Sequence, residues 1–318
     1  MKRLLLGLGV LSIVGCSSAT GGGGGDLDGG SGSGGMNLGG SGSGGALGGS
    51  GGAGGLVVTG GSGGGGGGTS PGCSVESQYV YVLDADAKLY KFDPPALTFT
   101  PIGVLNCPSS FLDTPFSMAV DRSANAWVVY TNGSLFKVDT KTAACSPTSF
   151  APAQAGFVTF GMGFSTEGAG STKDTLFVSQ SEMLGGTKGL ATIDTQSLVL
   201  TPIGMYDQIN ARAELTGTGD GKLFGAFEGS PYVVAQIDKS QAKILSQAPQ
   251  NQVQYPPGGS NFAFAFWGGS FWLFVGPGTS TDVFKYDPQV GSTVKLKTES
   301  FAIVGAGVST CAPIEPPK

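Results

Sequence analysis

A short strand pattern that ends in aspartate recurs five times in this chain, and the repeat limits the possible folds more than any other feature. Each copy alternates apolar and polar residues, as a β-strand with one buried face does. The closing aspartate can begin a tight turn by accepting backbone hydrogen bonds. The copies end at Asp93, Asp139, Asp194, Asp238 and Asp287, at intervals of 46, 55, 44 and 49 residues. The repeat predicts a fold built from similar β-units.

Further strands surround each copy of the pattern. The segments 97–103 and 198–204 follow the first and third copies, and both end in Thr-Pro-Ile-Gly, which indicates duplication. Two apolar strands precede a copy, as in the segments 116–130 and 262–275. Four strands in a period of about 45–50 residues are typical of the blades of a β-propeller.

The two ends of the repeated region complement each other. The segment 78–83 corresponds to the second strand of a blade, and the segment 301–308 corresponds to an innermost strand with nothing after it. Together they would complete one blade. The sequence therefore predicts an all-β fold: a five-bladed β-propeller of four-stranded blades whose N- and C-terminal ends share one blade. The alternative is an open array of β-meanders, which would leave strand edges exposed at both ends.

The stretch Ala-Val-Asp-Arg-Ser-Ala-Asn-Ala-Trp-Val at 119–128 resembles the NHL- and YVTN-type β-propellers. The chain is also similar to propeller lipoproteins of myxobacteria. The resemblance covers residues 75 to 313 or so, and it implies a fold much more than a function.

The first residues have the order of a lipoprotein signal peptide. Lys2 and Arg3 are followed by an apolar run over 4–15, which is too short to span a bilayer. The run ends in Ile-Val-Gly before Cys16, and this sequence resembles the lipobox after which lipoprotein signal peptidase cuts. We expect residues 1–15 to be removed and Cys16 to be lipidated, with Ser17 favouring the outer membrane of a Gram-negative cell. An ordinary signal peptide with an incidental cysteine is the alternative.

A segment of glycine and serine separates this N-terminus from the repeats. Thirty of the 52 residues from 21 to 72 are glycine. Such a chain has much conformational entropy to lose and little apolar surface to bury, so we expect a disordered tether with a reach of about 40 Å. The expected organisation is a lipidated start at 16–20, the tether at 21–72, the propeller at 73–314 and a tail at 315–318.

Four cysteines remain if Cys16 carries lipid, an even number in an oxidising compartment. Three pairings are possible. Cys311 follows the last inner strand and Cys73 precedes the strand that should continue the same blade, so we predict that these two pair. That leaves Cys107 and Cys145 to link the first and second blades.

Composition excludes several classes of function. The formal net charge is −5 without a basic stripe, so we expect no nucleic-acid partner. Histidine is absent, which removes Ser-His and Cys-His nucleophile pairs and the usual zinc sites. Asp84, Asp86 and Asp220 have carboxylate oxygens but lack the spacing of a known calcium loop. We expect no metal and no cofactor.

Aromatic residues suggest binding rather than catalysis. Trp267 precedes a Gly-Gly turn and Tyr232 and Tyr255 are close to loops, so we expect these three to offer a stacking surface to a glycan or an envelope protein. Hydrolysis of a glycoside needs two carboxyl groups positioned on either side of the scissile bond. Near the axis we expect Glu214 and Asp113 as the only acids, and the surrounding inner strands look like packing rather than a catalytic set. We therefore expect no catalytic residue and a monomer held to the membrane by its lipid. A structural scaffold of an envelope complex and a propeller glycoside hydrolase are the alternatives.

Overall fold

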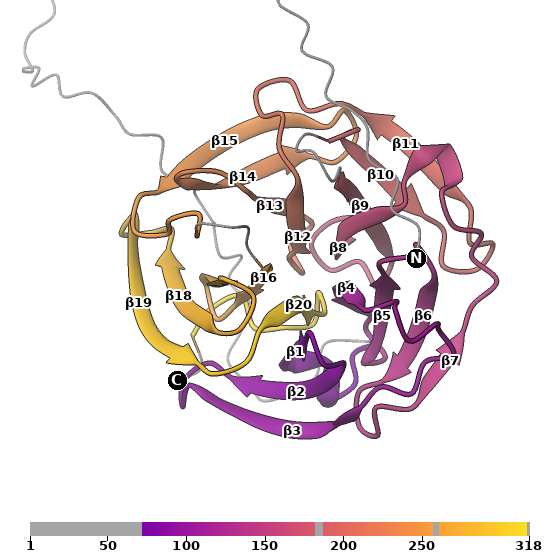
Figure 1. Ribbon diagram of the computed structural model, residues 1–318. Coiled ribbons are helices and arrows are strands. Elements are labelled where there is room, and N and C mark those ends of the chain that lie inside the picture. The colour runs from indigo at the N-terminus through magenta and orange to yellow at the C-terminus, as the bar shows by residue number, and fades with distance from the viewer. Residues whose placement is uncertain (1–71, 182–186, 257–260, 317–318) are drawn as a thin grey trace, which may run out of the picture. The chain divides into compact units, whose positions relative to one another are not determined.

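Five four-stranded antiparallel sheets surround a common axis in the structure, a computed structural model that describes residues 72–181, 187–256 and 261–316. Each sheet has one strand near the axis and one at the rim (Figure 1). The fold is therefore the predicted five-bladed β-propeller, and each aspartate pattern forms the third strand of a blade counted from the axis.

In each blade the strands follow one another from the axis outward in the order given below. Blade 1 contains β20 (Ile303–Val308), β1 (Val80–Asp84), β2 (Lys88–Asp93) and β3 (Thr98–Val104). Blade 2 contains β4 (Pro115–Val120), β5 (Asn125–Tyr130), β6 (Leu135–Asp139) and β7 (Cys145–Pro147). Blade 3 contains β8 (Thr159–Thr166), β9 (Asp174–Ser181), β10 (Leu190–Ile193) and β11 (Leu200–Gly204). Blade 4 contains β12 (Ala213–Gly217), β13 (Leu223–Phe227), β14 (Tyr232–Asp238) and β15 (Lys243–Gln250). Blade 5 contains β16 (Asn261–Trp267), β17 (Ser270–Gly276), β18 (Thr281–Asp287) and β19 (Ser292–Glu299).

Blade 1 closes the ring with strands from both ends of the repeated region. β20 pairs with β1 in antiparallel register, with Val308 opposite Val80 and Gly305 opposite Leu83. This pairing confirms the predicted shared blade and excludes the open array. It also removes the free strand edges that an open array would expose.

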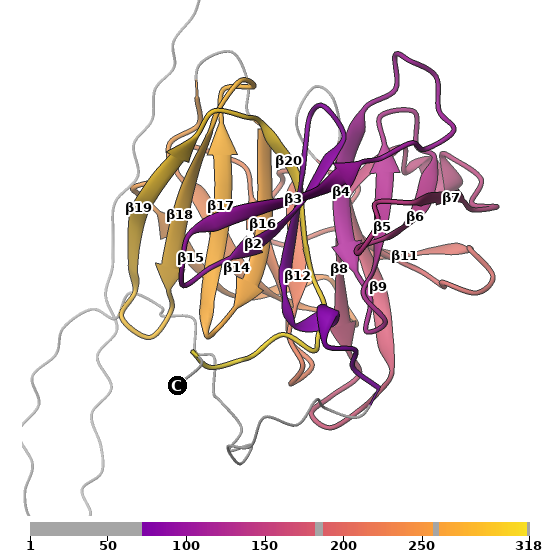
Figure 2. The same cartoon turned by 90° about the horizontal axis from the view of Figure 1, so that it is seen from below.

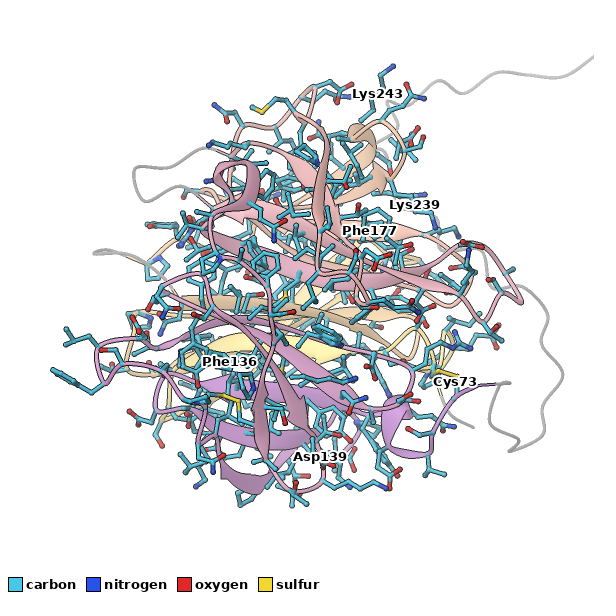
Figure 3. The ribbon with its side chains drawn as sticks, turned by 90° about the vertical axis from the view of Figure 1, so that its right-hand side faces the viewer. Cys73, Phe136, Asp139, Phe177, Lys239 and Lys243 are labelled. Carbon is cyan, nitrogen blue, oxygen red and sulfur yellow. A yellow bond between two sulfur atoms is a disulfide. The ribbon has the colours of Figure 1, made fainter. Side chains whose placement is uncertain are left out.

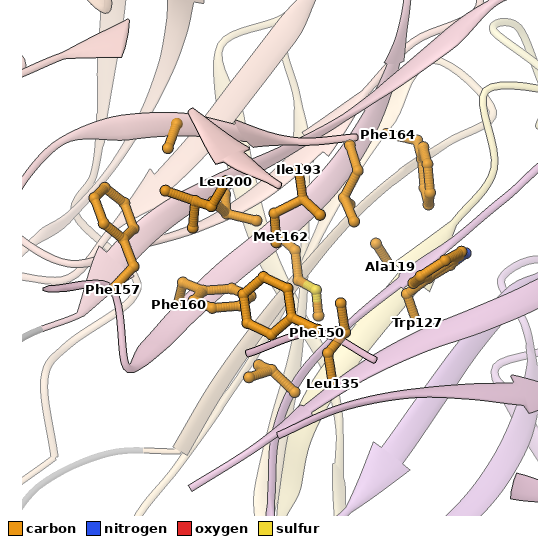
Figure 4. Packing of buried hydrophobic residues seen from close by; sticks show 14 residues of the cluster. Ala119, Trp127, Leu135, Phe150, Phe157, Phe160, Met162, Phe164, Ile193 and Leu200 are labelled. Carbon is orange, nitrogen blue, oxygen red and sulfur yellow. The ribbon is translucent and has the colours of Figure 1, made fainter. Parts of the chain in front are cut away.

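Five buried hydrophobic clusters hold the blades together, one at each interface between neighbouring blades. Figure 4 shows the cluster between blades 2 and 3, where Trp127 and Leu135 pack against Phe160 and Met162. A fully buried side chain of this size stabilises a fold by roughly 1.5–3 kcal/mol. The ring is thus held by packing around its whole circumference.

Glycines in the inner strands let those strands approach closely near the axis. A Cβ atom on Gly161 in β8 would lie 2.0 Å from the Ala213 carbonyl oxygen, and one on Gly217 in β12 would lie 2.1 Å from that of Phe164. Both distances are too short for any side chain. The apolar and small residues of the inner strands therefore serve packing, as the sequence suggested.

The repeated aspartates form turns of one type. Asp194 accepts hydrogen bonds from the backbone N–H groups of Gln196 at 2.9 Å and Ser197 at 2.7 Å. Asp139, labelled in Figure 3, accepts equivalent bonds after β6. The fourth residue after each aspartate has a positive φ: Leu97, Ala143, Leu198, Ala242 and Gly291. The predicted role of these aspartates as turn formers is confirmed.

Both predicted disulfides are present. Cys73 is bonded to Cys311, with 5.8 Å between their Cα atoms, and Cys107 is bonded to Cys145, with 5.0 Å between theirs. The first bond ties the segment before β1 to the segment after β20 (Cys73 is labelled in Figure 3). The second joins the loop after β3 to β7, and so blade 1 to blade 2.

The ring has two faces that are distinguished by the direction of its inner strands. We call the side where β4, β8, β12, β16 and β20 begin the channel face, and the side where they end the terminal face. On the terminal face, the chain leaves after β20 at the lower side of Figure 2, and the Ser74 N–H donates to the Arg122 carbonyl oxygen at 3.1 Å. The described chain therefore both starts and finishes at the terminal face.

The predicted signal peptide, Cys16 and the predicted tether up to residue 71 lie outside the described residues. Among the residues that the structure describes, no helix is long and apolar enough to cross a membrane.

Candidate functional site

Trp267 lies in a groove on the terminal face, between blades 5 and 1. The groove has a volume of about 420 Å³. Its walls come from β16 and β17, from the turn between β2 and β3 and from β19; they include Trp267, Trp272, Pro95, Leu97 and Leu296, with Lys285 as its charged residue. We call this the Trp267 groove. It combines apolar and aromatic walls with a single cation, a composition common in ligand sites.

The indole N–H groups of both tryptophans are bonded inside the protein. Trp267 Nε1 donates to the Gln78 carbonyl oxygen at 2.9 Å, and Trp272 Nε1 donates to the Trp267 carbonyl oxygen at 3.3 Å. These bonds fix the orientation of the rings. Trp267 is partly exposed and Trp272 is almost fully buried, so of the two rings Trp267 presents more surface to the groove.

The last described residues pass beside the same groove. The Gly268 N–H donates to the Pro313 carbonyl oxygen at 2.8 Å, and Pro316 lines the groove. A Cβ atom on Gly269 would lie 3.3 Å from the Ile314 carbonyl oxygen, and Gly269 has a φ of +75°. The Gly-Gly turn therefore leaves room for the C-terminal segment, which forms one edge of the groove.

The other two aromatic residues proposed from the sequence do not join Trp267. Tyr232 is fully buried, with its ring centroid 5.5 Å from that of Phe262, so the prediction that it offers a surface to a ligand is wrong. The reason is its position as the first residue of β14, where its side chain enters the interface between blades 4 and 5. Tyr255 is 39% exposed and precedes β16, whereas Trp267 ends that strand. The two exposed rings thus lie on opposite faces.

A second hollow opens on the channel face, where the inner strands begin. We call it the central pocket, and its volume is about 240 Å³. Four of the five blades contribute to its lining, which includes the apolar residues Phe116, Phe262 and Val304 and the polar residues Thr131 and Asn261. Arg212 and Glu214, both from blade 4, are the charged residues that line it among those the structure describes.

Glu214 is a buried acid within this pocket. Its side chain projects from β12, the residue is only 3% exposed, and its Oε2 accepts a hydrogen bond of 2.6 Å from Ser117 Oγ of β4. The Met162 backbone N–H of β8 also donates to it. Burial raises the pKa of Glu214 to about 8, although both hydrogen bonds and the charge of Arg212 act in the opposite direction. The carboxyl group is therefore mostly protonated at neutral pH.

Arg212 lies two residues before Glu214 and is already paired. Its guanidinium group forms an ion pair with Glu228, and its Cζ lies 5.2 Å from the ring centroid of Phe262. The positive charge of Arg212 is balanced by Glu228. A deprotonated Glu214 would therefore give the pocket one net negative charge.

The pair of acids that hydrolysis would need is not assembled. Asp113 accepts hydrogen bonds from the Ser110 N–H at 3.2 Å and from Asn132 Nδ2 at 2.8 Å, and it does not line the central pocket. Sequence reasoning identified Glu214 as an acid near the axis but missed Ser117 and Arg212. A single glutamate in an otherwise apolar inner strand was the available signal.

The acids considered for calcium have other roles. Asp84 Oδ1 accepts from the Asp86 N–H at 3.0 Å and the Lys88 N–H at 2.8 Å, and its Oδ2 accepts from Tyr90 Oη at 3.0 Å. Asp220 pairs with Lys222. Within the described ranges, no three acid, cysteine or histidine residues are grouped as a metal site would require.

Comparison with known proteins finds similarity of structure but not of sequence. No family model and no curated protein matches the chain. A chain of a nidogen/laminin complex has 10% identity and a TM-score of 0.46, over 72% of this chain and 97% of that one. A chain of a mitotic checkpoint complex has 13% identity and a TM-score of 0.37, over 73% and 66%. The Dos1 propeller has 11% identity and a TM-score of 0.41, over 77% and 79%.

Proposed function

We propose that this protein is a non-catalytic binding module of the bacterial cell envelope, anchored by lipid on Cys16, which binds a glycan at the Trp267 groove. The observation that carries the proposal is the groove itself, in which a partly exposed tryptophan lies next to a single cation. The absence of an assembled pair of acids around Glu214 supports binding rather than hydrolysis in the described part of the chain.

The chemistry of the groove suits a sugar ring. Because both indole N–H groups are occupied internally, the contact that Trp267 offers is apolar and aromatic, which matches the C–H groups of a pyranose. Lys285 can donate hydrogen bonds to hydroxyl or carboxylate oxygens at the edge of such a ring. It forms no ion pair with any carboxylate that the structure describes, and it is only partly buried. A glycan would therefore meet both a stacking surface and a hydrogen-bond donor.

The proposed anchor rests on the sequence alone. The order of Lys2, Arg3, the apolar run and Cys16 supports lipidation. Two or three acyl chains would hold the protein to a membrane, since each buried methylene contributes about 0.8 kcal/mol. In fractionated cells, Cys16→Ser should move the protein from the membrane to the soluble fraction. Retention of that variant in the membrane fraction would contradict the lipid anchor.

Glycan arrays probed with the full-length protein in detergent test the binding proposal. We expect Trp267→Ala to weaken binding by about fivefold to a hundredfold, on the order of the 1–3 kcal/mol that stacking of a nucleic-acid base on an aromatic side chain contributes. Tyr255→Ala is the matched control, because it removes an exposed ring on the opposite face and should leave binding unchanged.

Three other outcomes are decisive. Equal binding by wild-type protein and Trp267→Ala would exclude the groove as the glycan site. An absence of glycan binding, together with co-purification of one defined envelope protein, would favour the scaffold alternative. Turnover of a chromogenic glycoside that is lost in Glu214→Gln would favour the hydrolase.

A further inference from the structure

Glu214 is buried, and among the described residues it has no ion-pair partner of the kind that usually accompanies a buried acid. Its partners are the hydroxyl group of Ser117 at 2.6 Å and the backbone of Met162, both of which are uncharged. Isolated carboxylates are costly to bury, so proteins seldom keep one at an inner position unless it is paired or used. The residue also lines a pocket of about 240 Å³ on the channel face, whereas the Trp267 groove lies on the terminal face.

The charges around Glu214 come from one neighbouring pair. Arg212 precedes it on β12 and is neutralised by Glu228. The other elements that surround the pocket contribute no charge from the residues described there: Phe116 and Ser117 from β4, Met162 from β8, Phe262 from β16 and Val304 from β20. Among the described residues, only Arg212 adds positive charge near an ionised Glu214, and Glu228 offsets that charge, so a cation that enters the pocket would complete the balance.

We propose that the central pocket binds the primary ammonium group of a small ligand, with the ionised carboxylate of Glu214 as its counter-ion. The apolar walls formed by Phe116 and Val304 would contact the carbon atoms attached to the ammonium group, and Thr131 and Asn261 offer further oxygens to its N–H donors. Arg212 cannot act as the counter-ion, because its guanidinium group is positively charged like the ligand. That group is already paired with Glu228.

Binding of this kind releases a proton. In the free protein near neutral pH the carboxyl group carries a proton, because burial raises the pKa of Glu214 to about 8. The arriving ammonium group stabilises the carboxylate, so the carboxyl proton passes to solvent while the ammonium, with a pKa near 10, keeps its own. Affinity should therefore increase by about tenfold per pH unit around pH 6 and more slowly as the pH approaches about 8.

Calorimetric titration of the full-length protein in detergent tests the proposal. The probe is n-propylamine, and propan-1-ol is the neutral control of equal length. We expect the amine to bind more tightly at about pH 8 than at about pH 6, by about fiftyfold from the linkage above. Titrations in buffers with different ionisation enthalpies should show close to one proton released near pH 7. Tighter binding of glucosamine than of n-propylamine at about pH 7, where both are mainly ammonium ions, would identify an amino sugar rather than an alkylamine as the source of the ammonium group.

Two variants separate this site from the glycan site. Glu214→Gln keeps an oxygen for Ser117 but cannot ionise, so amine binding near pH 8 should fall at least tenfold and lose its dependence on pH. Trp267→Ala should bind the amine as the wild type does, even if it loses the glycan. Equal affinity for propylamine and propan-1-ol, or amine binding without proton release, would overturn the proposal. Proton release is measured on the wild type, so the test stands even if Glu214→Gln fails to fold.

Discussion

Cys73 and Cys311 are 238 residues apart in the sequence, and their disulfide joins the two ends of the repeated region that complete blade 1. The other disulfide, Cys107–Cys145, closes a loop of only 38 residues. In the chain-entropy account, a longer loop loses more freedom in the unfolded state when it is closed. The first bond should therefore stabilise the fold more than the second.

Removal of each disulfide tests this relation. The double variant Cys73→Ser/Cys311→Ser should lose about 5 kcal/mol of unfolding free energy, and Cys107→Ser/Cys145→Ser about 4 kcal/mol. Denaturant unfolding of both variants gives the comparison. A larger loss from the second pair would show that local packing, not loop length, governs the effect. Mass mapping without reduction should recover both pairs, and a Cys73–Cys107 peptide would contradict the structure.

The turn aspartates should contribute to stability in a way that depends on pH. Hydrogen bonds from the backbone of Ser197 and Gln196 and from the Ser197 hydroxyl lower the pKa of Asp194 from its usual 3.8. A lowered pKa in the folded state means that the contribution is present above that usual value and is lost as the pH falls below it. Asp194→Ala should therefore lower the melting temperature at neutral pH by a few degrees, with a smaller difference in acid.

A matched control for Asp194 is provided by Asp93. Asp93 accepts a single backbone hydrogen bond, from the Ala96 N–H at 3.2 Å. Asp93→Ala should lower the melting temperature less than Asp194→Ala does. Equal effects of the two substitutions, at neutral and at acid pH, would show that the hydrogen bonds to Asp194 contribute nothing measurable.

Glu214 should make stability depend on pH in the opposite direction to Asp194, so that its contribution is lost as the pH rises. Burial raises its pKa from 4.5 to about 8, so between these values the folded protein binds more protons than the unfolded chain. Wild-type stability should then decrease with rising pH across this window, by up to about 1.4 kcal/mol per pH unit from this group. Glu214→Gln removes the titration, so its stability relative to wild type should increase from about pH 5 to about pH 8. Parallel stability curves would show that Glu214 titrates normally.

The Gly-Gly turn beside Trp267 should control the C-terminal segment. Gly269 has a φ of +75° and a Cβ there would lie 3.3 Å from the Ile314 carbonyl oxygen, whereas Gly278 has a φ of +97° and open space around it. Substitution of either glycine by alanine should lower the free energy of unfolding by about 1 kcal/mol or more, because alanine disfavours positive φ. Only Gly269→Ala should also displace the segment 313–316, which faster hydrogen exchange at the Gly268 N–H, bonded to the Pro313 carbonyl oxygen, would reveal. Equal exchange at that N–H in both variants would contradict this contact.

The strand pattern was predictable because its signal is local. Alternation along five residues and a turn aspartate identify a strand and its end without reference to the rest of the chain, and all five third strands lie where the pattern places them. The shared blade was also predictable, since the first and last segments each lack the strand that the other supplies. The disulfide between Cys73 and Cys311 followed from that closure.

The candidate sites were less predictable, because they depend on the direction in which each side chain points and on residues that are far apart in the sequence. Tyr232 was expected near a loop, but the pleat of β14 turns its ring into an interface. Ser117 and Glu214 are 97 residues apart and come from blades 2 and 4, so no local pattern connects them. The sequence showed that Trp267 precedes a Gly-Gly turn. It did not show that residues of blade 1 would form the other wall of its groove.

By itself the sequence determined the number of blades and the strand order within them, because these follow from repeated short-range preferences. It favoured one of three cysteine pairings through the complementary ends of the repeated region, and the structure established that pairing. Only the tertiary structure decided which aromatic rings reach solvent and that Glu214 is buried over a pocket beside a neutralised arginine. The physical reason is that closing the ring brings the starts of the inner strands together at the axis. Burial and charge at that point are properties of all the blades together.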